Sequence, residues 1–165
     1  MHGGRSQEEY ARYVEDGEVN ARNMSRILKK FEGADKFLPK PIFKQETNAS
    51  SNGLIYFGST EAAMQESLDQ LSIAGFPIDA MRIRSFPFGA EVWDFIDQHE
   101  RIFLVEQNRD AQMKTLIVSE GSVNPQKFIS ILCFDGAPIT ANFISESILE
   151  IISENSVSKT AEEMK

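Results

Sequence analysis

The sequence predicts an α/β domain with a mostly parallel sheet layered by helices, preceded by a helical arm and an extended linker. Between residues 51 and 155, four apolar segments typical of strands each precede a pattern typical of a helix. The strand-like segments are mostly apolar, as expected of parallel strands that are buried on both faces. The first 50 residues differ, because they are polar and charged and contain two closely spaced prolines.

Residues 1–50 form the predicted arm. Five apolar side chains recur there at roughly helical spacing and predict one amphipathic helix: Val19, Met24, Ile27, Leu28 and Phe31. Pro39 and Pro41 then predict an extended linker, because each fixes its own φ and disfavours helix in the residue before it. We expect the arm to be a connection rather than a domain.

The α/β domain is predicted over residues 51–155. Its strand and helix pairs are expected at residues 54–59 and 60–75, 78–86 and 89–99, 101–107 and 110–121, and 127–134 and 140–153. Right-handed crossovers would place helices on both faces of a doubly wound sheet. Residues 156–165 carry little apolar content, so we expect a frayed tail.

Composition narrows the classes of function. The formal net charge of -8 argues against a nucleic-acid or anionic-membrane partner, since both require a concentrated basic surface. Cys133 is the single cysteine and cannot form an internal disulfide, which favours a reducing compartment. The sequence begins without an apolar signal and has no run near the roughly 20 apolar residues of a membrane helix. We therefore expect a cytoplasmic protein.

The first strand-to-helix turn contains Gly58, Ser59 and Thr60. Ligands of open α/β sheets bind at the carboxyl ends of the strands, so the four turns of this kind are where function is expected. Backbone amides of the first turn could hold an anion at the helix N-terminus. The turn has neither GxGxxG nor GxxxxGK[ST], however, and Ser59 or Thr60 as a plain N-cap is the favoured interpretation.

The second turn follows Arg82 and Arg84, which lie two residues apart on a strand and therefore share a face. One interpretation is that they bind carboxylates or phosphates, for which arginine is suited. The other is a solvated face of an edge strand. Phe86, Pro87 and Phe88 then form a stiff apolar loop, which we expect to pack against another surface.

The third turn is the richest in polar side chains. Asp110 is predicted to cap the next helix, which leaves four polar residues without an assigned role: Glu106, Asn108, Arg109 and Gln112. Catalysis is disfavoured, because general acid-base chemistry usually needs a group tuned near neutrality and the segment has neither His nor Cys. We expect these four residues to form a hydrogen-bonded contact network at an interface.

The fourth turn contains Cys133 and Thr140. Thr140 is predicted to cap the last helix, and Cys133 is interpreted as a small buried hydrophobic residue. A pair with His2 or His99 is disfavoured, because His2 lies in the arm and His99 precedes a strand at the other edge of the sheet. Two histidines and one cysteine at these separations match no pattern of metal ligands.

Five sequence blocks, taken together, resemble the carboxyl-terminal part of the alpha subunit of 2-oxoacid:ferredoxin oxidoreductases, in particular the 2-oxoglutarate type. The blocks span about residues 2–150 in family order and read YVEDGEVNARNM, YFGSTEAAMQESLDQL, MRIRSFPFGAEVWDFI, HERIFLVEQNRDAQM and FDGAPITANFI. This part of the family is similar to the transketolase carboxyl-terminal domain. The resemblance therefore implies the α/β architecture that the residue patterns predict independently.

The resemblance implies an enzyme complex that couples oxidative decarboxylation of a 2-oxoacid to acyl-CoA formation. The family uses thiamine diphosphate, magnesium, an iron-sulfur cluster and CoA, and passes electrons to ferredoxin. Its alpha subunit has an earlier domain with a YPITPS-like segment, and its beta subunit binds the diphosphate, magnesium and a cluster. This chain has neither that segment nor a cysteine cluster. We expect a fragment, a separately encoded part or an isolated domain that holds none of these cofactors and is inactive alone.

Our leading hypothesis is an assembly domain that contacts the beta subunit and the remaining alpha or gamma domains. The expected contact residues match two of the family blocks: Arg82, Arg84, Phe86, Pro87, Phe88, Glu106, Asn108, Arg109 and Gln112. No catalytic, cofactor-binding or metal-binding residue is assigned to the chain. The alternative is an independent α/β module that binds a small anionic ligand or nucleotide at the turns of Ser59 and Asn108. A third possibility is a remnant that retains only the fold.

Overall fold

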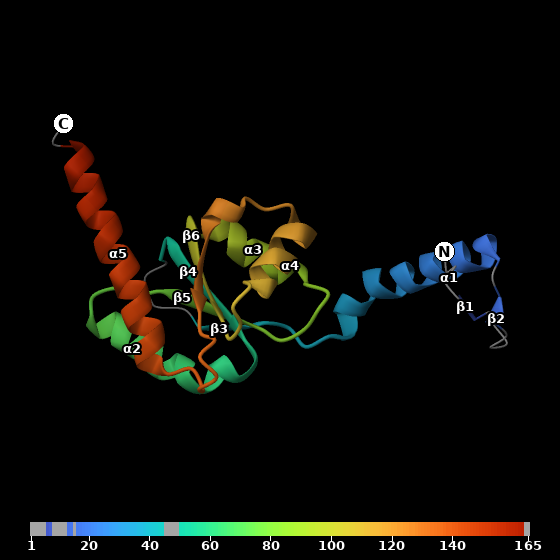
Figure 1. The fold of residues 1–165 in the computed structure, drawn as a ribbon, viewed down its shortest axis with the longest axis horizontal. Helices are drawn as coiled ribbons and strands as arrows, with labels where there is room; N and C mark the ends of the chain where they lie inside the picture. Colours follow the sequence, from blue (N-terminus) through green and yellow to red (C-terminus); the bar gives the residue numbers. More distant parts are fainter. Residues whose placement is uncertain (1–5, 8–12, 15, 45–49, 164–165) are drawn as a thin grey trace. The chain divides into compact units, whose positions relative to one another are not determined.

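The computed structural model describes residues 6–7, 13–14, 16–44 and 50–163. The chain divides into two compact units, which are drawn in Figure 1 and described here one at a time. The arm unit comprises residues 1–39 together with the loop 85–89, and the α/β unit comprises residues 40–84 and 90–165.

The arm unit is built around one helix. Strands β1 (Ser6–Gln7) and β2 (Tyr13–Val14) form a short antiparallel pair, and helix α1 (Gly17–Glu32) and the 3-10 helix η1 (Ala34–Phe37) follow. The carboxylate of Asp16 caps α1 by accepting hydrogen bonds from the amides of Glu18 at 2.7 Å and Val19 at 3.4 Å. The predicted amphipathic helix of the arm is therefore confirmed.

The α/β unit contains a five-stranded sheet in the order β3-β5-β4-β6-β7. Its strands are β3 (Ile42–Lys44), β4 (Asn52–Phe57), β5 (Asp79–Ile83), β6 (Arg101–Glu106) and β7 (Phe128–Leu132). All neighbouring pairs are parallel except β3 and β5. Residues 42–44, which we had assigned to the linker, thus form an antiparallel edge strand.

Helices cover both faces of this sheet (Figure 1). Helices α2 (Glu61–Ile73) and α5 (Ala141–Glu163) pack together on one face, and α3 (Ala90–Gln98) and α4 (Gln112–Gly121) lie on the other. The 3-10 helix η2 (Gly58–Thr60) precedes α2, and η3 (Pro125–Lys127) precedes β7. The predicted fold class, a mostly parallel sheet layered by helices, is confirmed.

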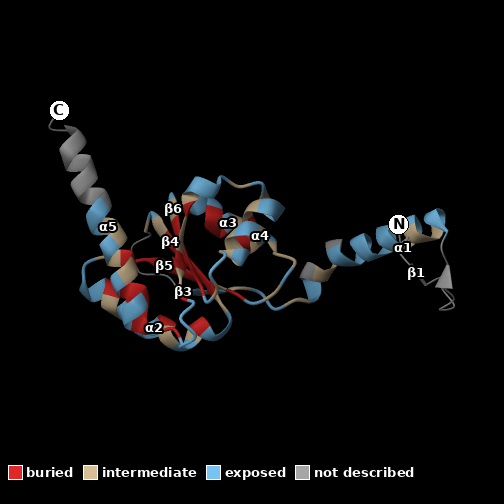
Figure 2. Ribbon diagram, viewed as in Figure 1, coloured by how far each residue is buried: buried red, intermediate tan, exposed pale blue. Residues whose placement is uncertain are grey.

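The buried core lies mainly along the strands and the helix faces that cover them (Figure 2). One cluster joins the sheet to α2 and α5 through apolar side chains, among them Leu54, Phe103, Val105, Met64, Leu71, Ile144 and Ile148. Residues on the opposite face of the same strands are also buried, which is why the strand sequences do not alternate. Helix α5 continues to Glu163 and so extends into residues 156–165, for which we expected a frayed tail.

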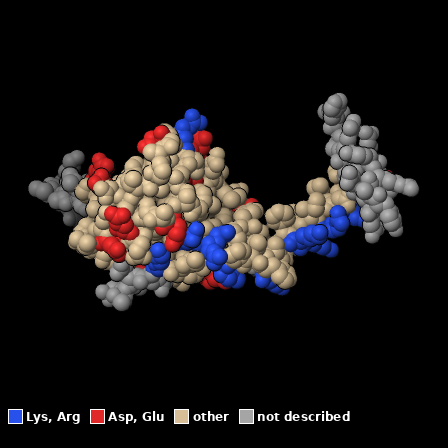
Figure 3. Space-filling view, turned by 90° about the horizontal axis from the view of Figure 1, so that it is seen from below, with Lys and Arg blue, Asp and Glu red and all other residues tan. Residues whose placement is uncertain are grey.

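Charge is unevenly distributed along the chain. Helix α1 carries four basic and two acidic residues, whereas residues 50–163 carry 7 basic and 17 acidic residues. Figure 3 shows Lys and Arg side chains along the arm unit and further ones on the α/β unit. Helix α1 is therefore a basic element of an acidic protein.

Candidate functional site

The turn after β6 is built around a buried carboxylate. Glu106 has no solvent-exposed surface, and its oxygens accept hydrogen bonds from the backbone amides of Met113 at 2.8 Å and Lys114 at 3.1 Å. The side-chain amide of Asn108 donates a third, at 2.8 Å. Backbone amides in the first turn of a helix have no partner within that helix. Glu106 thus caps α4 from the end of the preceding strand.

The loop that leads into α4 is held in a tight conformation. The side-chain oxygen of Asn108 accepts hydrogen bonds from the amides of Asp110 at 3.1 Å and Gln112 at 3.3 Å. Ala111 has a φ of 49°, a left-handed conformation that costs roughly 1–2 kcal/mol for a residue with a Cβ. The prediction that Asp110 caps α4 is wrong, because Glu106 and Asn108 already bind the amides at the start of the helix. Asp110 instead accepts a hydrogen bond from Arg109 Nε at 2.8 Å on the surface.

Gln107 joins the turn after β6 to the turn after β4. Its side-chain amide donates to the hydroxyl oxygens of Ser59 at 2.9 Å and Thr60 at 3.1 Å. Thr60, one of the two predicted candidates, occupies the N-cap position of α2, but its side chain makes no capping hydrogen bond there. The two hydroxyls serve as acceptors for Gln107 because β4 and β6 are neighbours in the sheet.

A pocket of about 420 Å³ lies between these two turns. It is lined by Phe57, Gly58, Ser59, Thr60, Gln107, Asn108, Gln112, Met113 and Leu116. This lining offers hydroxyls, carboxamides and apolar carbon, and it contains no histidine, cysteine or charged side chain. The pocket suits recognition by hydrogen bonding rather than proton transfer, which needs a titratable group within reach. The structure thus brings together Ser59, Asn108 and Gln112 from separate segments of the sequence.

A second polar cluster surrounds Glu61 in the first turn of α2. Tyr56 Oη donates a hydrogen bond to Glu61 Oε2 at 2.7 Å, and Lys44 Nζ and Arg82 Nε lie 3.5 Å and 3.6 Å from the Glu61 oxygens. Partial burial raises the pKa of Glu61, but the Tyr56 hydrogen bond and the two cations outweigh it and hold this pKa below its usual value. Burial, together with the neighbouring Glu61 charge, raises the pKa of Tyr56 far above its usual range. The cluster therefore stabilises an ionised Glu61 and a protonated Tyr56.

The two predicted arginines do not form one site. Arg82 is half-buried beside Glu61 and also donates to the carbonyl of Gly58 at 3.4 Å, whereas Arg84 is exposed and donates to the carbonyl of Lys40 at 3.5 Å. Arg82 Nε is buried without a hydrogen-bond partner among the described residues, and its interaction with Glu61 is an ion pair. The apolar residues 86–88 lie in the arm unit.

The structure corrects one of the predicted contact residues. Glu106 is fully buried beneath the turn, so it has no surface on which a partner could bind, and its assignment as a contact residue is wrong in this fold. Asn108 is half-buried and lines the pocket, while Arg109 and Gln112 are exposed. Glu106 positions the turn that presents these three side chains.

Sequence reasoning missed Tyr56, Glu61 and Gln107. A tyrosine inside an apolar strand is a usable signal, because a buried hydroxyl needs a partner, and Glu61 follows five residues later. Gln107 stands between two residues that we did select, but nothing in the local pattern indicates that it bridges to Ser59. That contact depends on strand order.

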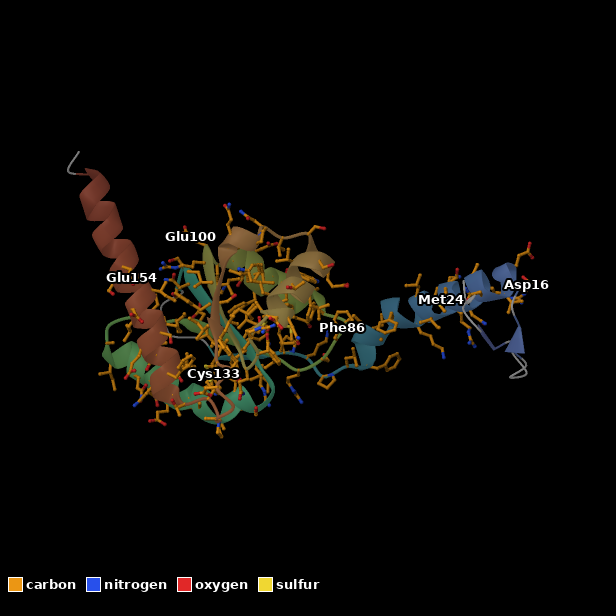
Figure 4. All side chains as sticks on the ribbon, viewed as in Figure 1. Asp16, Met24, Phe86, Glu100, Cys133 and Glu154 are labelled. Carbon is orange, nitrogen blue, oxygen red and sulfur yellow. The ribbon has the colours of Figure 1, made fainter. Side chains whose placement is uncertain are left out.

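Cys133 and His99 occupy separate structural environments. Cys133 is buried in the core (Figure 4), and burial together with the neighbouring Asp135 carboxylate raises the pKa of its thiol. The interpretation of Cys133 as a small buried residue is confirmed. His99 lies before β6, where Nδ1 is 2.6 Å from the carbonyl of Phe95 and Nε2 is 3.2 Å from Asp79 Oδ2. Cys133 instead lies beyond the carboxyl end of β7, so the two do not pair, and His2 lies outside the described residues.

The described part of the chain has neither a group of metal ligands nor a membrane-spanning helix. Within residues 6–7, 13–14, 16–44 and 50–163, no three His, Cys, Asp or Glu side chains are grouped so that they could hold a metal ion. In the same part of the chain, no helix has both the length and the apolar character required to cross a membrane.

Comparison with known proteins relates the chain to one group of enzymes. No protein-family model matches it. The chain is 26% identical over 154 residues to 2-oxoacid:ferredoxin oxidoreductase 2, subunit alpha, of Aeropyrum pernix. This match covers 90% of the chain but 24% of the relative, so the chain spans about a quarter of the length of that protein.

One solved structure shares the fold. The 2-oxoglutarate:ferredoxin oxidoreductase from Magnetococcus marinus, solved with 2-oxoglutarate, coenzyme A and succinyl-CoA bound, superposes with a TM-score of 0.73 at 20% identity and covers 87% of this chain and 25% of its own. The alpha chain of a probable 2-oxoacid ferredoxin oxidoreductase from Thermoplasma acidophilum matches at a TM-score of 0.46 and 22% identity, over 69% of this chain and 97% of its own. The match to the Aeropyrum pernix subunit confirms the predicted resemblance to the alpha subunits of 2-oxoacid:ferredoxin oxidoreductases.

Proposed function

We propose that this chain is an assembly domain from the alpha subunit of a 2-oxoacid:ferredoxin oxidoreductase and is inactive alone. The observation that carries the proposal is the match to a curated alpha subunit over 90% of this chain but only 24% of the relative. The complete cytoplasmic complex would convert a 2-oxoacid and CoA to acyl-CoA and CO2 while reducing ferredoxin. We propose 2-oxoglutarate as the substrate and the carboxyl-terminal part of the subunit as the origin of this segment.

The cofactors of this reaction would be held by other parts of the complex. An iron-sulfur cluster requires several thiolate ligands, and the chain has one cysteine, which is buried in the core. The polar groups around Glu106 and Glu61 are bound to one another, which suits a structural role. Thiamine diphosphate, magnesium, the cluster and CoA are accordingly proposed for the beta subunit and the remaining alpha or gamma domains, with ferredoxin as the electron acceptor.

The contacts with those partners are proposed for exposed side chains at the strand ends. Arg84, Arg109 and Gln112 are exposed, and Asn108 is half-buried beside them on the β6 turn. Arginine side chains are enriched at protein interfaces because the guanidinium forms bidentate hydrogen bonds with carboxylates and stacks on aromatic rings. Arg82 would contribute through the Glu61 cluster, and residues 86–88 would contribute from the arm unit.

Reconstitution tests this proposal. The purified chain is assayed with 2-oxoglutarate, CoA, thiamine diphosphate, magnesium and an oxidised ferredoxin, alone and after mixing with the separately produced remainder of the alpha subunit and the beta subunit. We expect no turnover by the chain alone, a complex on mixing, and activity of that complex. Turnover without the added subunits, or no complex on mixing, would contradict the proposal.

The pocket favours a second candidate function, an independent module for a small anionic ligand or nucleotide. The observation in its favour is the volume of about 420 Å³ between the turns of Ser59 and Asn108. Thermal unfolding with millimolar inorganic phosphate or ADP tests it. A shift of several degrees is expected if the ligand greatly exceeds its dissociation constant. An unchanged melting temperature with both ligands would contradict this function.

A further inference from the structure

The arm unit exposes an apolar surface along one side of α1. Met24, Ile27, Leu28 and Phe31 follow at positions i, i+3, i+4 and i+7, so they lie on one face of the helix. Between 41% and 62% of each of these side chains is exposed. Amphipathic helices with anchors at this spacing dock in apolar grooves of other proteins.

This surface continues into the loop 85–89 of the same unit. The Phe86 ring centroid lies 6.5 Å from that of Phe31, and the Phe88 ring meets Phe86 edge-on at 5.2 Å. The hydroxyl of Ser85 donates to the carbonyl of Pro39 at 2.8 Å and ties the loop to the end of the arm. We call Met24, Ile27, Leu28, Phe31 and Phe86 the arm patch; Figure 4 labels its Met24 and Phe86.

The opposite face of α1 is basic. Arg22, Arg26, Lys29 and Lys30 are all exposed, and at 100° per residue they lie on the side of the helix away from the arm patch. With two acidic residues, the helix has a formal charge of +2 in a chain of -8. A partner whose apolar groove covers the arm patch would also extend to the basic face of α1. Carboxylates at the border of that groove would then complement the charge of this face.

We propose that the arm patch docks into an apolar groove bordered by carboxylates, on the part of the alpha subunit that this chain does not span. This inference rests on the proposed function, and charge complementarity defines the partner as an acidic protein surface. The curated relative is about four times as long as the matched segment, so most of its surface is available to supply such a groove. An anionic membrane is disfavoured because the chain as a whole is strongly negative.

Binding measurements with matched variants test the arm patch. The chain is titrated against the separately produced remainder of the alpha subunit, and the Kd is measured by calorimetry. The double substitution Ile27→Asp with Leu28→Asp places carboxylates in the apolar groove, and we expect the Kd to rise on the order of 100-fold. Ser25→Asp introduces the same group on the same helix outside the patch, and we expect it to change the Kd less than about threefold.

Charge reversal tests the nature of the partner. Arg26→Glu with Lys29→Glu is expected to raise the Kd about tenfold at low salt, with the difference shrinking as salt rises. A difference that persists unchanged at high salt would overturn the acidic partner.

Four other results would overturn the proposed docking surface, and they differ in whether the proposed function is also contradicted. If the wild-type chain does not bind the remainder of the subunit, the proposed function fails together with this inference. If it binds and the Ile27 and Leu28 variant binds equally well, the docking surface is wrong while the proposed function stands. If sedimentation shows that the wild-type chain is a dimer and that the variant is a monomer, the arm patch binds a second copy of this chain. If the variant lowers the melting temperature of the isolated chain, the patch packs within the chain itself.

Discussion

The turns after β4 and β6 both contain a glutamate at a helix N-terminus, but the two carboxylates are stabilised differently. Glu106 is the last residue of its strand, is fully buried, and accepts hydrogen bonds from two backbone amides of α4. Glu61 lies inside the helix that follows its strand, and about a third of its side chain (34%) is exposed. Its partners are the Tyr56 hydroxyl and two cations.

The difference teaches how burial decides the role of a polar residue. A fully buried carboxylate must be satisfied by hydrogen bonds, and removal of either partner leaves an unpaired polar group in the core. A partly exposed carboxylate keeps water as an alternative partner, so its ion pairs contribute less. Both glutamates are therefore engaged by groups of their own chain.

The largest effect is expected for Glu106→Ala. It leaves the amides of Met113 and Lys114 without their acceptor and removes the support of the left-handed turn at Ala111. We expect the free energy of unfolding in urea to fall by about 3 kcal/mol. Glu106→Gln keeps one accepting oxygen and is expected to lose roughly half as much. If the alanine variant lowers the free energy of unfolding by less than about 1 kcal/mol, the buried Glu106 does not contribute more to stability than the partly exposed Glu61.

An intermediate effect is expected for Tyr56→Phe, which removes the hydrogen bond of 2.7 Å to Glu61. We expect a loss of about 1.5 kcal/mol at pH 7, since the acceptor is ionised. The melting temperature is measured from pH 7 to pH 3. Glu61→Gln is the matched variant, because it keeps the shape of the side chain and cannot ionise.

The pH dependence of this cluster follows from the lowered pKa of Glu61. A carboxylate whose pKa is lower in the folded state contributes stability above its unfolded-state pKa of about 4.3 and loses it as the pH falls through the folded-state pKa. The cost of Tyr56→Phe should therefore shrink below about pH 4. A penalty that stays constant over the whole range would exclude an ionised Glu61 as the partner of Tyr56.

The smallest effect is expected for Arg109→Ala. The side chains of Arg109 and Asp110 are 74% and 57% exposed, so their ion pair should contribute less than about 0.5 kcal/mol to folding. Thr140→Ala is the control for sensitivity, since Thr140 accepts a hydrogen bond from the amide of Phe143 at 3.2 Å and its loss should cost about 1 kcal/mol. If Arg109→Ala destabilises the chain more than Thr140→Ala, the exposed residues of the β6 turn are structural.

The regular elements of the fold were predictable because their signals are local. The spacing of apolar residues identified α1, and the apolar strand segments identified four strands of the sheet, close to their observed bounds. Strand β3 was not predicted, because three residues after two prolines carry no pattern, and their pairing with β5 is a contact between distant segments.

The candidate site was predictable only in part. The carboxyl ends of parallel strands were expected to gather polar side chains, and Ser59, Asn108 and Gln112 do share one pocket. Thr140 was also correctly predicted as a capping residue. Asp110 was wrongly predicted as the cap of α4. The residue that caps a helix is the one whose acceptor lies within hydrogen-bonding distance of the first amides in the folded chain, and here that acceptor is the buried Glu106.

The sequence by itself determined the α/β class, the amphipathic helix of the arm and the resemblance to an oxidoreductase alpha subunit, because periodicity and sequence blocks are local features. Tertiary structure alone decided the roles of individual polar residues. Strand order placed Gln107 against Ser59 and Arg82 beside Glu61. Glu106, which we had predicted to contact a partner, is buried and caps α4 instead. The physical reason is that the energy of a polar group depends on its partners and its access to water, and both arise only when distant segments meet.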